Sequence, residues 1–284
     1  MTSFTVGIDL AKNVFSLHGV DAHGKVTLRK TVKRNKLLAA LGNLPEDTLI
    51  GMEACSGAHH WARQFQKLGY TARIMASRFV TPYRKGGKND NNDAEAICEA
   101  VGRPNMRFVS IKSPDQQSAL CVHRLRQGLV RARTAQINQL RGLLMEFGIV
   151  IRKSRESVQR EVPLILADAE NDLPWVMRQL IEDAFKRLLQ LNDDIADYDK
   201  MIHSLAQRTE SAKKLLAIPG VGEMTATAIV ASVSDAKQFK SCRHFTAWLG
   251  LTPKQHTTGG VVRLGRITRR GDIYLRTLLV HGAR

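Results

Sequence analysis

The chain has 284 residues, and its 43 Lys and Arg against 26 Asp and Glu give a formal net charge of +17 at pH 7. A pI near 10.1 favours a polyanionic partner, with nucleic acid as the leading candidate and a solvated basic surface without a ligand as the alternative. The four cysteines form no C-x-x-C pair, and the sequence has no signal segment and no run of about 18 apolar residues, so we expect a cytoplasmic protein without disulfides or a zinc knuckle.

The first third of the chain reads as alternating strands and helices. Residues 5–12, 14–20 and 25–32 predict a three-strand meander, with a turn at residues 21–24. Further elements are expected in the order helix, strand, helix, strand and helix. They cover residues 35–44, 48–54, 58–68, 71–76 and a last helix that begins at Asp90 or Asn91. This order matches the ribonuclease H-like scaffold, an α/β fold with a mixed sheet.

Acidic residues end two of these strands and open the last helix. Asp9 ends the first strand, Glu53 ends the fourth, and Asp90 and Asp93 lie in the first helical turn. Carboxylates that converge in this way can hold a divalent cation, which prefers oxygen ligands. Taken singly, Asp9 has the alternative reading of a turn residue and Asp90 that of an N-cap. For Glu53 such a reading is weaker, because a buried carboxylate without a partner is costly.

The middle of the chain predicts two long amphipathic helices with coiled-coil-like seams. One runs from about Pro114 to Phe147, and the other carries apolar residues at 3-4-3-4-3 spacing from Leu188 to Leu205. They could pair within one chain or between chains. Pro163 and Pro174 are expected to interrupt the segment between them.

The last part of the chain combines glycines, hydroxyls and basic side chains. Residues 215–226 predict a helix-hairpin-helix whose turn, with Gly220 and Gly222, can hold a DNA phosphate by backbone N–H groups; a simple helix turn is the alternative. Beyond it, Thr257 and Thr258 precede two glycines. Five basic side chains surround this loop as candidate phosphate ligands: Lys254, Arg263, Arg266, Arg269 and Arg270. Passive phosphate binding is the alternative to catalysis here.

Basic side chains dominate residues 103–160 and 243–284, whereas acidic ones dominate residues 161–200. This pattern suggests two surfaces that face nucleic acid, separated by a segment that faces solvent or another subunit.

Six motifs, in order, resemble the DEDD transposases of the insertion-sequence one-ten family, especially its eleven-eleven subgroup, over nearly the whole chain. They are Gly7-Ile8-Asp9-Leu10-Ala11-Lys12, Met52-Glu53-Ala54-Cys55-Ser56-Gly57, Asn89-Asp90-Asn91-Asn92-Asp93-Ala94, Ile218-Pro219-Gly220-Val221-Gly222, Leu249-Gly250-Leu251-Thr252-Pro253 and Arg269-Arg270-Gly271-Asp272-Ile273-Tyr274-Leu275-Arg276.

The resemblance implies a RuvC-like domain over residues 1–112, a coiled-coil connector over 113–208 and a C-terminal transposase domain over 209–284. It further implies a recombinase, related to pilin-gene DNA invertases, that is guided by a structured noncoding RNA pairing with donor and target DNA. Such an enzyme is expected to be a homo-oligomer, a dimer or a tetramer. Family members are also expected to run beyond residue 284, which leaves truncation open.

The resemblance also assigns roles to residues of the site. It makes Asp9, Glu53, Asp90 and Asp93 ligands of Mg²⁺. It places the family's nucleophilic serine on Thr258, with Thr257 as the fallback. Threonine can act as a nucleophile when it is activated, although its methyl group crowds the attacking oxygen.

Two other functions remain compatible with the same residues. One is a RuvC-type metal-dependent nuclease of the junction-resolvase kind, in which water attacks and Thr258 only binds phosphate. The other is a nucleic-acid-binding relative that is catalytically impaired.

Overall fold

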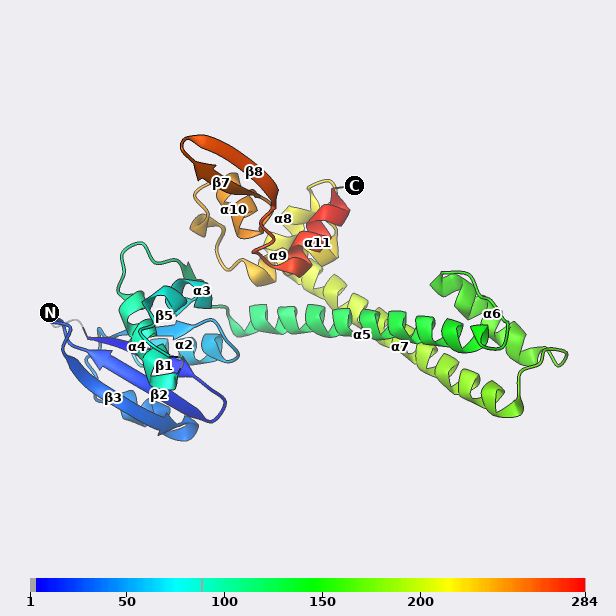
Figure 1. The fold of residues 1–284 in the computed structure, drawn as a ribbon, viewed down its shortest axis with the longest axis horizontal. Coiled ribbons are helices and arrows are strands. Elements are labelled where there is room, and N and C mark those ends of the chain that lie inside the picture. Colours follow the sequence, from blue (N-terminus) through cyan, green and yellow to red (C-terminus); the bar gives the residue numbers. More distant parts are fainter. Residues whose placement is uncertain (1–3, 88, 284) are drawn as a thin grey trace. The chain divides into compact units, whose positions relative to one another are not determined.

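The computed structural model describes residues 4–87 and 89–283, and it divides into two compact units, Met1–Ser113 and Pro114–Arg284 (Figure 1). The three-domain division at residues 112 and 208 stays a prediction. No helix in the described part of the chain combines the length and the apolar character needed to cross a bilayer.

The first unit is built on a six-stranded mixed sheet with the strand order β3-β2-β1-β4-β5-β6. The strands are β1 (Thr5–Leu10), β2 (Val14–Val20), β3 (Val26–Lys33), β4 (Leu49–Glu53), β5 (Thr71–Met75) and β6 (Phe108–Val109). β1 pairs antiparallel with β2 and parallel with β4. The three-strand meander is confirmed, and the mixed sheet is compatible with a ribonuclease H-like fold. The short β6, which pairs with β5, was not expected from the sequence.

In the described part of this unit, the helical elements are η1 (Arg34–Lys36), α1 (Leu37–Leu41), α2 (Ala58–Lys67), α3 (Ser77–Val80), η2 (Thr81–Tyr83) and α4 (Asp90–Val101). α4 begins where the sequence predicted. Its N-cap, however, is Asn89, whose side chain accepts a hydrogen bond of 2.9 Å from the backbone N–H of Asn92. The reading of Asp90 as the cap is therefore wrong, which leaves its carboxylate available for another role.

Strand alternation gives the sheet two different faces. On one face Val6 and Ile8 are fully buried in a core that also contains Trp61 and Phe65 of α2. On the other face α4 lies against β1 at Gly7, so closely that a Cβ at this position would collide with the backbone of Ala94 and Cys98. Only glycine permits this approach between helix and strand.

We predict that Gly7→Ala lowers the free energy of unfolding by about 1–3 kcal/mol, because backbone atoms of α4 must move to accept the methyl group. Gly102→Ala is the matched control. Gly102 is the C-cap residue of α4, and a methyl group added there meets nothing within 4 Å. Urea unfolding of the two variants measures the difference. Equal stabilities would contradict the close packing at Gly7.

The second unit begins with three helices, α5 (Pro114–Met145), α6 (Arg155–Ala167) and α7 (Trp175–Arg208). α5 and α7 pack against one another within the chain. Pro174 precedes α7, as expected, but Pro163 lies inside α6. The expectation that Pro163 interrupts the chain here is wrong. Burial of its neighbour Val162 against α5 and α7 supports the helix despite the lost backbone donor.

The remaining elements of the second unit are shorter. They are α8 (Glu210–Leu216), α9 (Glu223–Ser232), η3 (Ala236–Gln238), α10 (Cys242–Trp248), the hairpin β7 (Pro253–Thr258) and β8 (Val261–Ile267), and α11 (Ile273–Gly282). A small core around Ala228, Leu249 and Leu275 joins α9, the end of α10 and α11.

A buried histidine links α5 to both α9 and α11. His123 is only 1% exposed, with its Nε2 at 3.1 Å from Thr227 Oγ1 and its Nδ1 at 3.0 Å from the Tyr274 hydroxyl. Because the Thr227 hydroxyl donates to the carbonyl of Glu223 at 2.7 Å, it accepts from His123, and Nδ1 accepts from Tyr274. Burial lowers the pKa of His123 to about 4, with the charge of Arg126 as the second cause, so the ring is neutral.

We predict that this histidine makes the second unit acid-sensitive. Its folded pKa lies below the ordinary value of 6.5, so its stabilisation is complete above that value and is lost as the pH falls towards 4, at up to about 1.4 kcal/mol per pH unit. The free energy of unfolding, measured with urea at several pH values, should change less with pH in His123→Gln than in the wild type. His281→Gln, which changes an exposed histidine, should keep the wild-type slope; a wild-type slope in His123→Gln would refute the assignment.

Candidate active site

Asp9 and Glu53 lie at the ends of two neighbouring parallel strands. β1 and β4 pair with Ile8 opposite Met52, so the two acids follow at adjacent positions. Alternation places Asp9 on the same face as Gly7 and Glu53 on the same face as Gly51. Both glycines pack against α4, so both strand-end acids belong to the face that α4 covers.

α4 packs across this face of the sheet. Cys98 Sγ donates to the carbonyl of Thr5 at 3.4 Å, and Gly7 meets the backbone of Ala94 and Cys98. Gly51, on the neighbouring strand, meets Val101. The first turn of the same helix carries Asp90 and Asp93. Asp9 and Glu53 thus lie on the face covered by the helix that carries the other two predicted acids.

The electrostatics near the strand ends agree with this placement. Burial raises the pKa of the Cys55 thiol, and the charges of Asp9 and Glu53 raise it further. Cys55 lies just after β4, and its thiol is 4.0 Å from the carbonyl oxygen of Leu10. Both acids are therefore close to the loop that follows β4.

The carboxylates do not form one coordination shell in this structure. Ser77 Oγ donates to Glu53 Oε2 at 2.7 Å, and Arg84 Nη1 lies 3.3 Å from Asp93 Oδ1. Within residues 4–87 and 89–283, no three His, Cys, Asp or Glu side chains are grouped closely enough to hold a metal ion. The chemistry of the acidic set nevertheless fits a hard divalent cation, because all its donors are carboxylate oxygens.

Thr258 lies in the second unit, at the end of β7 rather than in a loop. Gly259 and Gly260, with φ of 56° and 82°, form the two-residue turn to β8. Thr258 pairs with Val261, and His256 pairs with Arg263. Directly paired residues and alternate residues share a face, so Thr258, His256 and Arg263 lie on one face of the hairpin.

Thr257 lies on the opposite face. It pairs with Val262, and Gln255 on the same face donates from Nε2 to Thr257 Oγ1 at 3.1 Å. Chemistry-bearing side chains therefore gather around Thr258 and not around Thr257. His256 was not among the residues selected from the sequence; the alternation of the strand, once the hairpin register is known, reveals it.

The other predicted phosphate ligands have varied surroundings. Lys254, Arg263 and Arg266 are exposed on the hairpin, and Arg269 and Arg270 are exposed just after it. Gly222 precedes α9 with open space around it. Gly220, by contrast, packs against the carbonyl of Gly282, so its glycine is required by packing within the unit.

Arg276 is a structural residue that sequence reasoning left without a role. Its side chain is 8% exposed, and Nη1 donates to the carbonyls of Leu249 at 2.8 Å and Gly271 at 3.4 Å. These two residues lie before and after the hairpin in the sequence. Arg276 thus holds the base of the hairpin onto α11.

Comparison with known proteins finds family models that match residues in both units. The model of a DEDD transposase family, described as "Transposase", matches residues 6–149, and that of the "Transposase IS116/IS110/IS902 family" matches residues 212–284. The chain belongs to the IS110 family of transposases. Such transposases cut and rejoin DNA, so the predicted family and enzyme class are confirmed. The DEDD family is generally metal-dependent.

Individual relatives cover nearly the whole chain. A probable family 20 transposase of Pseudomonas aeruginosa is 47% identical over 280 residues, which are 98% of this chain and 82% of the relative. The transposase for insertion sequence element IS1111A of Coxiella burnetii is 40% identical over 279 residues, 98% of this chain and 76% of the relative. A pilin gene-inverting protein of Moraxella bovis is 31% identical over 72 residues, 24% of this chain and 22% of the relative.

Proposed function

We propose that this IS110-family transposase is a recombinase that joins itself to DNA through the hydroxyl of Thr258. The observation that carries the proposal is the common face of Thr258, His256 and Arg263 on an exposed hairpin. The hydroxyl attacks a phosphodiester, a Thr258 Oγ–P bond forms, and the bond from phosphorus to one DNA oxygen breaks. The released DNA oxygen takes a proton, and a DNA hydroxyl later reverses the step to rejoin the strand.

His256 is the general base in this proposal. It shares the face of Thr258 two residues away along β7, and an imidazole can accept the hydroxyl proton as the new bond forms. Arg263, directly opposite His256, is positioned to neutralise charge on the phosphate under attack. The opposite face, with Gln255, Thr257 and Val262, offers no comparable base.

The acids of the first unit are proposed to hold Mg²⁺. Asp9 and Glu53 would supply ligands from the strand ends, and Asp90 and Asp93 from α4, with Arg84 withdrawing from Asp93. The ion would orient the scissile phosphate and stabilise the charge that develops on it. Asn89, by capping α4, leaves the Asp90 carboxylate available for this role.

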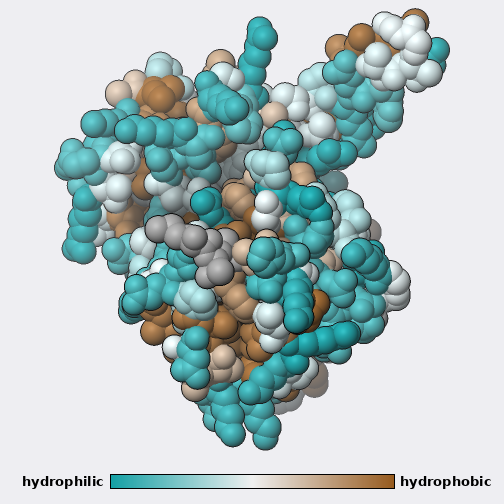
Figure 2. All heavy atoms as spheres, turned by 90° about the vertical axis from the view of Figure 1, so that its left-hand side faces the viewer, coloured by the Kyte–Doolittle hydropathy of each residue, from teal (hydrophilic) through white to brown (hydrophobic). Residues whose placement is uncertain are grey.

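The partners in the proposal are donor and target DNA and a structured noncoding guide RNA. The net charge of +17 supports binding to these large polyanionic partners. On the face shown in Figure 2, hydrophilic side chains cover most of the surface and hydrophobic ones form smaller areas between them. The α8–turn–α9 segment would act as a helix-hairpin-helix that holds a phosphate near Gly222.

The proposal includes a homo-oligomer, because a recombinase must hold two duplexes at once. The packed pair α5 and α7 is proposed as a coiled-coil connector between residues 113 and 208. A junction-resolvase nuclease remains the second candidate, since carboxylates with a metal ion suffice for attack by water.

We predict that Thr258→Ala abolishes a covalent protein–DNA adduct that wild-type protein forms with Mg²⁺, copurified RNA and labelled DNA. Thr258→Ser should retain or raise adduct formation, since it keeps the hydroxyl and removes the methyl group. Thr257→Ala is the control on the opposite face, and EDTA should prevent the adduct. Denaturing gels separate the outcomes: free nicked ends without adduct indicate the nuclease, and an adduct that survives in Thr258→Ala places the nucleophile elsewhere.

We predict that His256→Ala slows adduct formation by about 10²–10⁴-fold, the usual contribution of a general base. Added imidazole should restore part of the rate, because it can take the place of the missing base. Gln255→Ala, on the other face, is the matched control. A His256→Ala rate within two-fold of wild type at equal DNA binding would remove this residue from the chemistry.

A further inference from the structure

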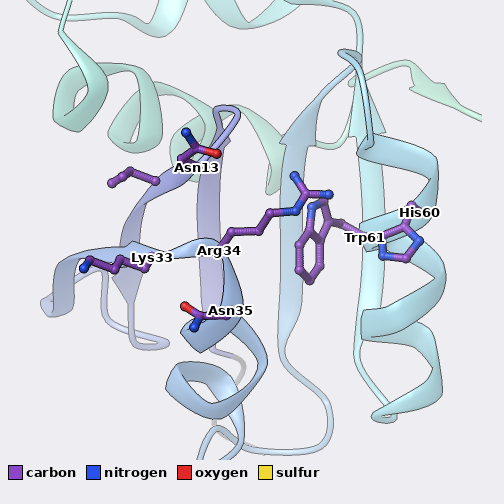
Figure 3. A pocket seen from close by; sticks show the side chains of 7 residues that line it. Asn13, Lys33, Arg34, Asn35, His60 and Trp61 are labelled. Carbon is purple, nitrogen blue, oxygen red and sulfur yellow. The ribbon is translucent and has the colours of Figure 1, made fainter.

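A pocket lies on the side of the first unit's sheet opposite α4. Its volume is ≈ 530 Å³, within the range of about 300–1,000 Å³ that is usual for ligand sites. Three segments line it: the β1–β2 turn, the end of β3 with η1, and the first turn of α2 (Figure 3). The lining residues are Asn13, Val14, Lys33, Arg34, Asn35, His60 and Trp61. Among these described residues none is acidic.

Arg34 is the centre of the pocket, and several contacts hold it in place. Its guanidinium carbon lies 5.3 Å from the ring centroid of Trp61 and 5.9 Å from that of Phe15. Nη1 donates to the carbonyl of Lys12 at 3.3 Å, and the backbone N–H donates to the carbonyl of Asn13 at 2.8 Å. Figure 3 shows the side chain reaching from η1 towards the indole. A planar cation is thus presented to solvent on an aromatic wall.

The side chains around Arg34 can bind the other parts of a nucleotide. Asn13 and Asn35 are exposed amides, each able to donate and accept, as the edge of a base requires. Lys33 and His60 are also exposed, and Lys33 carries a positive charge suited to a phosphate. A guanidinium plane is a recognised stacking surface for bases that have left a duplex.

We propose that this pocket binds an unpaired nucleotide of a single-stranded nucleic acid, with the base stacked on Arg34. A paired base cannot enter, because its faces are covered by its neighbours in the duplex. The proposal rests on the nucleic-acid binding in the proposed function and is independent of its nucleophile. Asn13 lies in the turn that follows the end of β1 carrying Asp9, so the held strand would lie at the acidic end of the sheet.

The test compares the full chain's binding to labelled single-stranded oligonucleotides with and without bases. DNA, RNA and abasic DNA of equal length and charge are titrated at one salt concentration by fluorescence anisotropy. Wild-type protein should bind the DNA with bases about ten-fold more tightly than the abasic strand, since stacking contributes about 1–3 kcal/mol per base. The RNA arm shows which sugar the site prefers. Equal affinities for strands with and without bases would overturn the proposal.

Variants assign the preference to this pocket. Arg34→Lys keeps the charge but removes the planar surface, so the ratio between the two DNA strands should fall to about one with little change in abasic binding. Arg29→Lys, an exposed arginine on β3, is the matched control and should keep the ratio. Asn35→Ala leaves the contact of Arg34 with Trp61 intact and should lower the ratio by about three-fold through a lost hydrogen bond.

If both Arg34→Lys and Asn35→Ala keep the wild-type ratio of affinities for strands with and without bases, the preference does not come from this pocket. The adduct assay gives a separate result: absence of the Thr258 adduct, with the base preference retained, contradicts the proposed chemistry and leaves the pocket in place.

Discussion

The backbone contact between α4 and β1 at Gly7 is the constraint on which the first unit depends. A helix can approach a strand this closely only where no side chain intervenes, and Gly7 and Gly51 remove the side chains on two neighbouring strands. The approach sets how closely α4 packs on the sheet. The acids at the ends of β1 and β4 therefore lie on the face that α4 covers.

The alternation of side chains along β1 and β4 separates acidic residues from apolar core residues. Odd-numbered positions of β1 and β4 place acids and glycines towards α4, whereas Val6, Ile8, Ile50 and Met52 enter the core under α2. At the edge of that core, Trp61 and Phe15 support the guanidinium of Arg34. The first unit thus carries strand-end acids on one face and a basic, aromatic pocket on the other.

In the second unit, buried polar groups hold the hairpin and the helices together. A two-stranded hairpin is marginally stable by itself, and every residue of β7 is exposed. Arg276 fixes the base of this hairpin through the carbonyls of Leu249 and Gly271, and His123 joins α5 to α9 and α11. Because these groups are buried, each lost partner leaves an unsatisfied polar atom. They keep an exposed hairpin attached to an ordered base.

The strands of the meander, the long helices and the family could be predicted from the sequence alone, and the acids could be selected there as candidates. These depend on local periodicity, turn residues and motifs that lie within short stretches. It could not select Asn89 over Asp90 as the cap, since both can accept the same backbone N–H. Nor could it foresee that α6 would continue through Pro163, because burial of the neighbouring Val162 involves residues distant in sequence.

Which side chains share a face depends on how distant segments pair, and this is known from the folded chain. The family resemblance prefers Thr258 to its neighbour Thr257, but the physical difference between them comes from the hairpin register, which puts only Thr258 on the face of His256 and Arg263. The pocket around Arg34 likewise joins residues 13, 34 and 61, which no local pattern connects. The physical reason is the same in both cases: a shift of one residue in strand pairing moves every side chain to the other face, and pairing is fixed by contacts between segments and not within them.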